Sequence, residues 1–162
     1  MKETDRIHEQ LKQAFEGGAW HGPALLELLD GIGSTIAAAR PVSGIHSIWE
    51  IVLHLTGTQK LMLRRMRGES SAIELAPDED WPPAPDPTEA NWQETLDILK
   101  AGEADLQCSV ERLPRAKLDA PLIDGSSSAY NNLHGYVQHM LYHAGQISLL
   151  KKAALQQVTE RK

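Results

Sequence analysis

Cysteine is nearly absent from this sequence, since Cys108 is the only one among 162 residues. One thiol cannot close a disulfide within the chain, and it cannot build a thiolate cage around a metal ion. Any metal ion that the chain binds is therefore held by nitrogen and oxygen ligands. We also do not expect Cys108 to act as a nucleophile, because it falls inside a predicted helix without an evident activating neighbour.

Long hydrophobic runs and an excess of positive charge are missing as well. No apolar run approaches the roughly 20 residues that cross a bilayer, and the N-terminal sequence MKETDR is polar where a signal peptide needs an apolar stretch. The formal net charge of −6 disfavours a phosphate-binding surface, because affinity for nucleic acid depends mainly on Lys and Arg side chains. We therefore expect a cytoplasmic protein that binds neither a membrane nor nucleic acid.

Hydrophobic periodicity predicts an all-α chain that forms a single domain over residues 1–162. Hydrophobic residues make up 41% and charged residues 23% of the chain, which is ordinary for a globular protein. No alternating pattern is long enough to predict a sheet. An antiparallel four-helix bundle is the fold that the pattern favours. The predicted helices cover residues 4–15, 47–67, 88–113 and 130–157, and a further piece at 23–31 continues or follows the first.

The boundaries of the predicted helices carry recognisable capping and breaking residues. Ser47 and Glu50 have the S-x-x-E spacing of a capping box, so the second long helix begins at about Ser47. Residues 69–87 contain five prolines and are expected to form a long irregular crossover between the second and third long helices. Trp81 is a candidate for fixing that crossover to the bundle.

Three of the seven histidines are candidate metal ligands. His139 and His143 are four residues apart on a predicted helix, so both rings lie on one face and can reach one ion. His54 lies among apolar neighbours in the second long helix, where an imidazole needs a buried partner. His134 faces elsewhere, because at about 100° per residue it is roughly 140° from His139 around the helix. The histidines interpreted as structural or exposed are His8, His21 and His46.

Polar residues beside these histidines leave several roles open. Gln146 lies three residues after His143 and Glu50 one turn before His54, so each could orient an imidazole or a bound water molecule. Glu50 is more simply explained as the capping partner of Ser47. The three histidines could also form a purely structural cluster that only hydrogen-bonds, and such a cluster would bind no metal ion.

Two motifs in the helices that carry these histidines resemble those of the DinB-like (DinB/YfiT-like) metal-binding four-helix bundles. The second long helix reads SIWEIVLHL over residues 47–55, which resembles the family's W-x-x-x-x-H signature. The last helix reads HMLYHAGQI over residues 139–147, which is similar to the more specific H-x-x-x-H-x-G-Q-I signature. The order and separation of the predicted helices along the whole chain agree with the same family.

The resemblance implies a metal site. Family members hold a divalent ion, often nickel or zinc, with three histidines, and these correspond to His54, His139 and His143. Three neutral imidazoles leave an open metal position, which is typical of catalytic rather than structural zinc sites. Relatives that resemble this chain include transferases and isomerases that use a low-molecular-weight bacterial thiol, such as bacillithiol or mycothiol.

From this resemblance we expect a metal-dependent thiol S-transferase that acts on a small-molecule thiol and an electrophilic substrate. Gln146 and Glu50 are candidate helpers, and no catalytic side chain is assigned. A metal-dependent hydrolase and a noncatalytic metal-binding or ligand-binding bundle are alternatives that the sequence does not separate. The resemblance further implies a homodimer formed through bundle helices, and the family name gives no reason to infer DNA binding.

Overall fold

The fold is all-α over the residues that the computed structural model describes, which are 2–69, 72 and 74–160. This confirms the predicted fold class. Within that part of the chain, the nearest approach to a sheet is an isolated antiparallel bridge between Pro121 and Ser128. The helices are α1 (Glu3–Phe15), α2 (Leu25–Leu29), α3 (Ser34–Ala38), α4 (Ile48–Met66), α5 (Pro77–Asp80), α6 (Glu89–Glu111) and α7 (Ala129–Glu160), and a 3-10 turn covers Arg115–Lys117.

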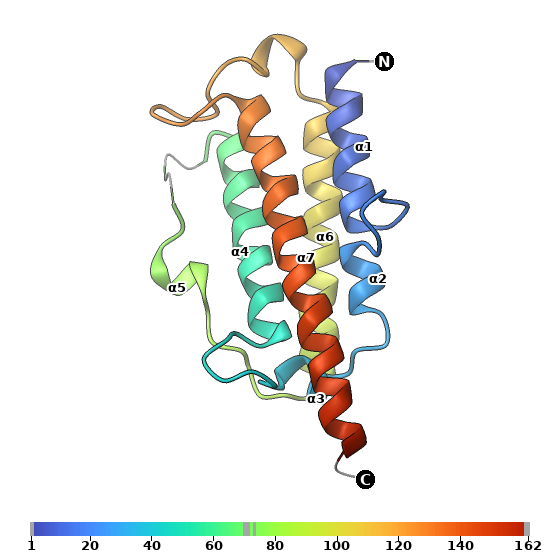
Figure 1. Ribbon diagram of the computed structural model, residues 1–162. Coiled ribbons are helices and arrows are strands. Elements are labelled where there is room, and N and C mark those ends of the chain that lie inside the picture. Colours follow the sequence, from blue (N-terminus) through green and yellow to red (C-terminus); the bar gives the residue numbers. More distant parts are fainter. Residues whose placement is uncertain (1, 70–71, 73, 161–162) are drawn as a thin grey trace.

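The long helices α1, α4, α6 and α7 lie side by side and make the body of the molecule (Figure 1). Both α6 and α7 pack against α4, and both also pack against α1. Because α4 and α7 run in opposite directions, the N-terminal half of α4 lies beside the middle of α7 (Figure 1). This pairing positions the candidate site.

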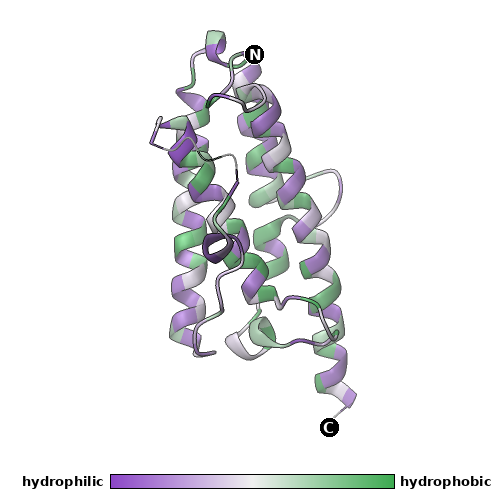
Figure 2. Ribbon diagram, turned by 90° about the vertical axis from the view of Figure 1, so that its left-hand side faces the viewer, coloured by the Kyte–Doolittle hydropathy of each residue, from purple (hydrophilic) through white to green (hydrophobic). Residues whose placement is uncertain are grey.

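The core between the long helices is mostly apolar, and its two buried tryptophans have hydrogen-bond partners. Hydrophobic and hydrophilic residues alternate along each long helix, as expected of helices with one buried face (Figure 2). Trp49 and Trp92 are fully buried; their indole N–H groups donate to Thr95 Oγ1 at 3.0 Å and to the carbonyl of Ile32 at 2.6 Å. Among the described residues, no helix is both long enough and apolar enough to cross a membrane.

The start of α4 follows the capping-box prediction. Ser47 Oγ accepts a hydrogen bond from the backbone N–H of Glu50 at 3.2 Å, and the Glu50 carboxylate accepts one from the N–H of Ser47 at 2.8 Å. At the start of α6, Thr88 Oγ1 accepts from the N–H of Asn91 at 3.2 Å. Both predicted starts are therefore confirmed, and the cap of α4 fixes where His54 enters the bundle.

One connection between the long helices differs from the prediction, and another settles an alternative that it left open. The piece predicted at 23–31 is the short helix α2, which follows α1 as a separate helix. The prediction of an irregular crossover over residues 69–87 is wrong at α5, where Pro77 occupies the first helical turn and needs no N–H partner. Residues 70, 71 and 73 of that predicted crossover lie outside the described residues.

Candidate metal centre

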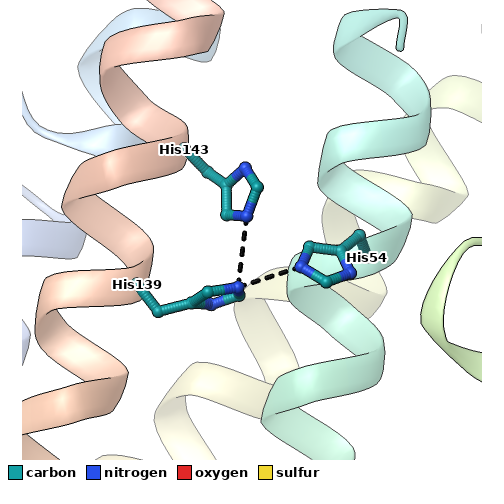
Figure 3. Close-up of side chains that lie close together, drawn as sticks. All are labelled: His54, His139 and His143. Carbon is teal, nitrogen blue, oxygen red and sulfur yellow. Dashed lines mark hydrogen bonds between the residues drawn. The ribbon is translucent and has the colours of Figure 1, made fainter. Parts of the chain in front are cut away.

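Two helices bring the three candidate histidines together. His54 comes from α4, and His139 and His143 come from consecutive turns of α7, so that all three rings point into the space between the two helices (Figure 3). His54 Nε2 lies 2.9 Å from His139 Nε2, and His143 Nε2 lies 3.1 Å from the same atom. One ligand nitrogen from each residue lies within 4.8 Å of the others, so the cluster could hold a metal ion.

The partners of the outer ring nitrogens fix the tautomers of two histidines. His54 Nδ1 lies 2.8 Å from the backbone carbonyl oxygen of Asp80 and 2.9 Å from its carboxylate Oδ1. His143 Nδ1 lies 2.7 Å from the amide oxygen of Gln146. These oxygens can only accept hydrogen bonds, so both histidines donate from Nδ1–H. The Nε2 atoms of His54 and His143 therefore carry lone pairs.

Those two lone pairs both meet Nε2 of His139. A single proton on His139 Nε2 can be directed at only one of them, so at least one of the two short contacts is left without a hydrogen bond unless a cation lies between the rings. His139 Nδ1 is buried and has no partner among the described residues. Converging imidazole nitrogens are the donor set of zinc, nickel, copper and iron sites.

The surroundings keep His139 and His143 neutral at pH 7. Burial, together with the charges that His143 and His54 would carry, lowers the pKa of His139 to about 4. Burial also lowers the pKa of His143, and the hydrogen bond to Gln146 opposes this shift. Neutral imidazole is the form that binds metal ions, so neither ring needs to lose a proton at neutral pH before coordination.

Two of the three nitrogen–nitrogen distances are close to those around a small transition-metal ion. Four ligands at 2.0–2.1 Å in a tetrahedron place their nitrogen atoms about 3.3 Å from one another. The contacts of 2.9 and 3.1 Å are close to this spacing. Two of the three rings are also held at their outer nitrogen by Asp80 and Gln146, as metal-binding histidines usually are.

The two polar residues predicted to assist the histidines lie in different places. Gln146 contacts His143 directly. The Glu50 carboxylate accepts hydrogen bonds from Ser47 and from Arg40 at the start of α4, which is the capping arrangement that the sequence also allowed.

The remaining histidines lie outside the three-histidine cluster. His134 packs against Tyr130 with ring centroids 4.3 Å apart, so it faces away from the cluster as its helical position predicted. His8 Nε2 lies 3.3 Å from the Glu111 carboxylate. His21 is exposed on the connection between α1 and α2.

Asp80 and Trp81 are the residues near the site that the sequence analysis did not assign to it. The Trp81 ring lies parallel to the His54 ring, with centroids 4.1 Å apart and an interplanar angle of 3°. Its other face stacks on His46 at 3.8 Å. Trp81 stood out as an anchor for the crossover, but no spacing in the sequence linked Asp80 to a histidine 26 residues away.

Comparison with known proteins places the chain in a family. Residues 19–147, which include all three histidines, match the family model described as the DinB superfamily. The chain belongs to the DinB superfamily. A crystal structure of a conserved protein from Enterococcus faecalis is similar to this DinB-superfamily chain, with a TM-score of 0.73 and 17% identity over 96% of this chain and 99% of that one. Identity this low shows a shared fold alone. No curated protein matches the sequence.

Proposed function

We propose that this DinB-superfamily protein binds one divalent transition-metal ion through His54, His139 and His143. The observation that carries the proposal is the convergence of three Nε2 atoms, two of which have their tautomer set by Asp80 and Gln146. Hydrogen bonding alone can satisfy only one of the two short contacts with His139 Nε2, whereas a cation between the rings can accept the lone pairs of all three Nε2 atoms. The resemblance of the two histidine motifs to metal-binding family members supports the same conclusion.

Nickel and zinc are the proposed metals. Imidazole nitrogen suits nickel, zinc, copper and iron, and raw affinity favours copper, so geometry and cellular supply decide the occupant. Nickel and zinc are the ions that the family resemblance implies. The lack of any cysteine near the three histidines is consistent with an all-nitrogen site.

The proposed activity is metal-dependent transfer of a low-molecular-weight thiol, such as bacillithiol or mycothiol, to an electrophilic substrate. A divalent ion with an open position lowers the pKa of a thiol toward neutrality and thereby supplies a thiolate nucleophile. The protein's own residues supply the imidazole ligands and hold them in place. Asp80 and Gln146 do this by keeping the protons of His54 and His143 on Nδ1.

Elemental analysis of protein purified without a histidine tag tests the metal site. Wild type should carry about one metal ion per chain, and His54→Ala and His143→Ala should carry none. His134→Ala is the matched control, because His134 is on α7 but outside the cluster. Wild-type protein that takes up no metal, even after nickel and zinc are supplied, would overturn the proposal.

The proposed activity is tested with metal-loaded Cys108→Ser protein. This variant has no thiol of its own, because Cys108 is the only cysteine in the sequence. Bacillithiol should be consumed in the presence of an activated aryl halide, an epoxide or a Michael acceptor, and removal of the metal should stop the reaction. Ester hydrolysis in the absence of thiol would instead indicate that the protein is a metal-dependent hydrolase. Metal binding with no turnover of either kind would indicate a noncatalytic protein.

We further propose that the protein forms a homodimer through α7. Tyr142 and Leu149 are 65% and 70% exposed on one face of that helix. Gly145 lies on the same face, and a side chain there would meet none of the described residues beyond its own stretch of helix within 4 Å. A second copy of the chain would bury the exposed apolar side chains. Light scattering at several concentrations should give twice the monomer mass, and a monomer throughout would contradict the dimer.

A further inference from the structure

A short segment of the crossover lies across the outer face of α4 and reaches the three-histidine cluster. We call this segment, Pro77–Trp81, the strap. It comprises α5 and the residue that follows it, and Figure 2 shows α5 in front of the bundle. The strap belongs to neither of the helices that carry the histidines, yet α5 packs against α4.

The strap is seated on α4 by close backbone contact and by an ion pair. A Cβ atom at position 57 would lie 2.6 Å from the backbone carbonyl oxygen of Glu79, so only glycine permits this approach. The Arg64 guanidinium donates two hydrogen bonds of 3.1 Å to the Glu79 carboxylate. Position 57 therefore controls how closely the strap can approach the helix, although Gly57 has no side chain to bind anything.

The end of the strap holds His54 from two directions. Asp80 presents its carbonyl and carboxylate oxygens to His54 Nδ1 at 2.8 and 2.9 Å. Trp81 covers one face of the same ring at 4.1 Å and is itself backed by His46 at 3.8 Å. These contacts fix both the tautomer and the rotation of the ring. Without them, His54 could turn about its side-chain bonds and present Nδ1 instead of Nε2.

We propose that the strap is part of the metal centre, with Asp80 and Trp81 as positioning residues for His54, and that seating of the strap and metal binding are coupled. The inference rests on the proposed metal binding. Coupling is reciprocal by thermodynamic necessity: a seated strap raises the affinity for the ion, and a bound ion keeps the strap seated. Outer partners of metal-binding histidines typically change metal affinity by about 10- to 100-fold.

A matched pair of glycine substitutions tests the coupling without touching any ligand. Gly57→Ala displaces the strap by its clash with Glu79, whereas Gly135→Ala adds a methyl group with no described residue of another element within 4 Å. Both positions are helical and lie three or four residues from a candidate ligand, His54 or His139. The affinity of each variant for zinc, measured by competition with a chelator, should fall about tenfold or more for Gly57→Ala and stay within about twofold of wild type for Gly135→Ala.

Unchanged zinc affinity in a folded Gly57→Ala protein would overturn the coupling while leaving the proposed metal site intact. Absence of zinc binding in wild type would instead overturn the proposed function and the coupling with it. If Gly57→Ala does not fold, hydrogen exchange of wild type decides. Zinc should slow exchange of the amides of Glu79, Asp80 and Trp81, and equal exchange rates with and without bound zinc would overturn the coupling.

Discussion

The carboxyl group of Glu103 is buried in the core, away from the histidines. Glu103 is 1% exposed, and its Oε2 accepts hydrogen bonds from Gln59 Nε2 at 3.0 Å and from the Tyr136 hydroxyl at 2.9 Å. Its Oε1 has no partner among the described residues. Burial is the main cause that raises the pKa of Glu103 to about 6, against the opposing effect of these hydrogen bonds. The folded protein therefore binds a proton at Glu103 more tightly than the unfolded chain does.

Glu103→Gln should stabilise the protein at pH 8 and stabilise it much less at pH 5. A raised pKa contributes stability below the unfolded value of 4.5, and that contribution is lost as pH rises through about 6. The raised pKa lowers the stability of the wild type by about 2 kcal/mol at pH 8. The variant avoids this loss because it has no charge to bury. Urea unfolding at both pH values checks this, with the exposed Glu94→Gln on the same helix as control. A variant that is less stable than wild type at pH 8 would contradict the argument.

Residue-level prediction from sequence succeeded where helical spacing decides the outcome. His139 and His143 share a face because they are four residues apart, and His134 is excluded by the same rule. The burial of Glu103 was not predicted, although its position four residues after Leu99 and three before Leu106 places it on the apolar face of α6. Asp80 carried no signal, because its contact with His54 depends on the path of a crossover that no periodicity describes.

At the scale of the element, the N-terminal cap of α4 determines where His54 enters the bundle. Ser47→Ala should lower the free energy of unfolding by about 1 kcal/mol, because the backbone N–H of Glu50 loses its acceptor and Ser47 is itself 2% exposed. Chemical denaturation measures the change. Ser43→Ala, in the exposed loop before the helix, is the control and should leave stability within about 0.5 kcal/mol. Equal effects of the two substitutions would show that the cap does not stabilise α4.

The long helices were predictable and the short helix α5 was not, for a physical reason. The helix α6 is 23 residues long and repeats its apolar positions along that length. Periodicity and the Thr88 cap therefore predict its extent without knowledge of the neighbouring helices. The helix α5 has no buried residue and no such repeat. Its position depends on two contacts with α4, the close approach of Glu79 to Gly57 and the hydrogen bond from Arg64 to Glu79. Both contacts join residues that are distant in the sequence.

At the scale of the molecule, the three histidines join two antiparallel helices that the sequence separates by 62 residues, from Met66 to Ala129. The family motifs indicated both helices, and the apolar pattern indicated that they pack together. The distance between His54 and His139 depends on the crossing of α4 and α7, which only the packed structure defines. An ion bound at this place would connect the two helices directly.

Zinc or nickel should therefore raise the thermal stability of the whole molecule. An ion that binds only the folded state at about 100 times its dissociation constant adds about 2.7 kcal/mol, which corresponds to a rise in Tm of roughly 5–10 °C for a chain of this size. Scanning calorimetry with and without a chelator measures the rise. His139→Ala removes the nitrogen shared by both short contacts and should show no shift, whereas His134→Ala should behave as wild type. A full shift in His139→Ala would mean that the ion binds elsewhere on the protein.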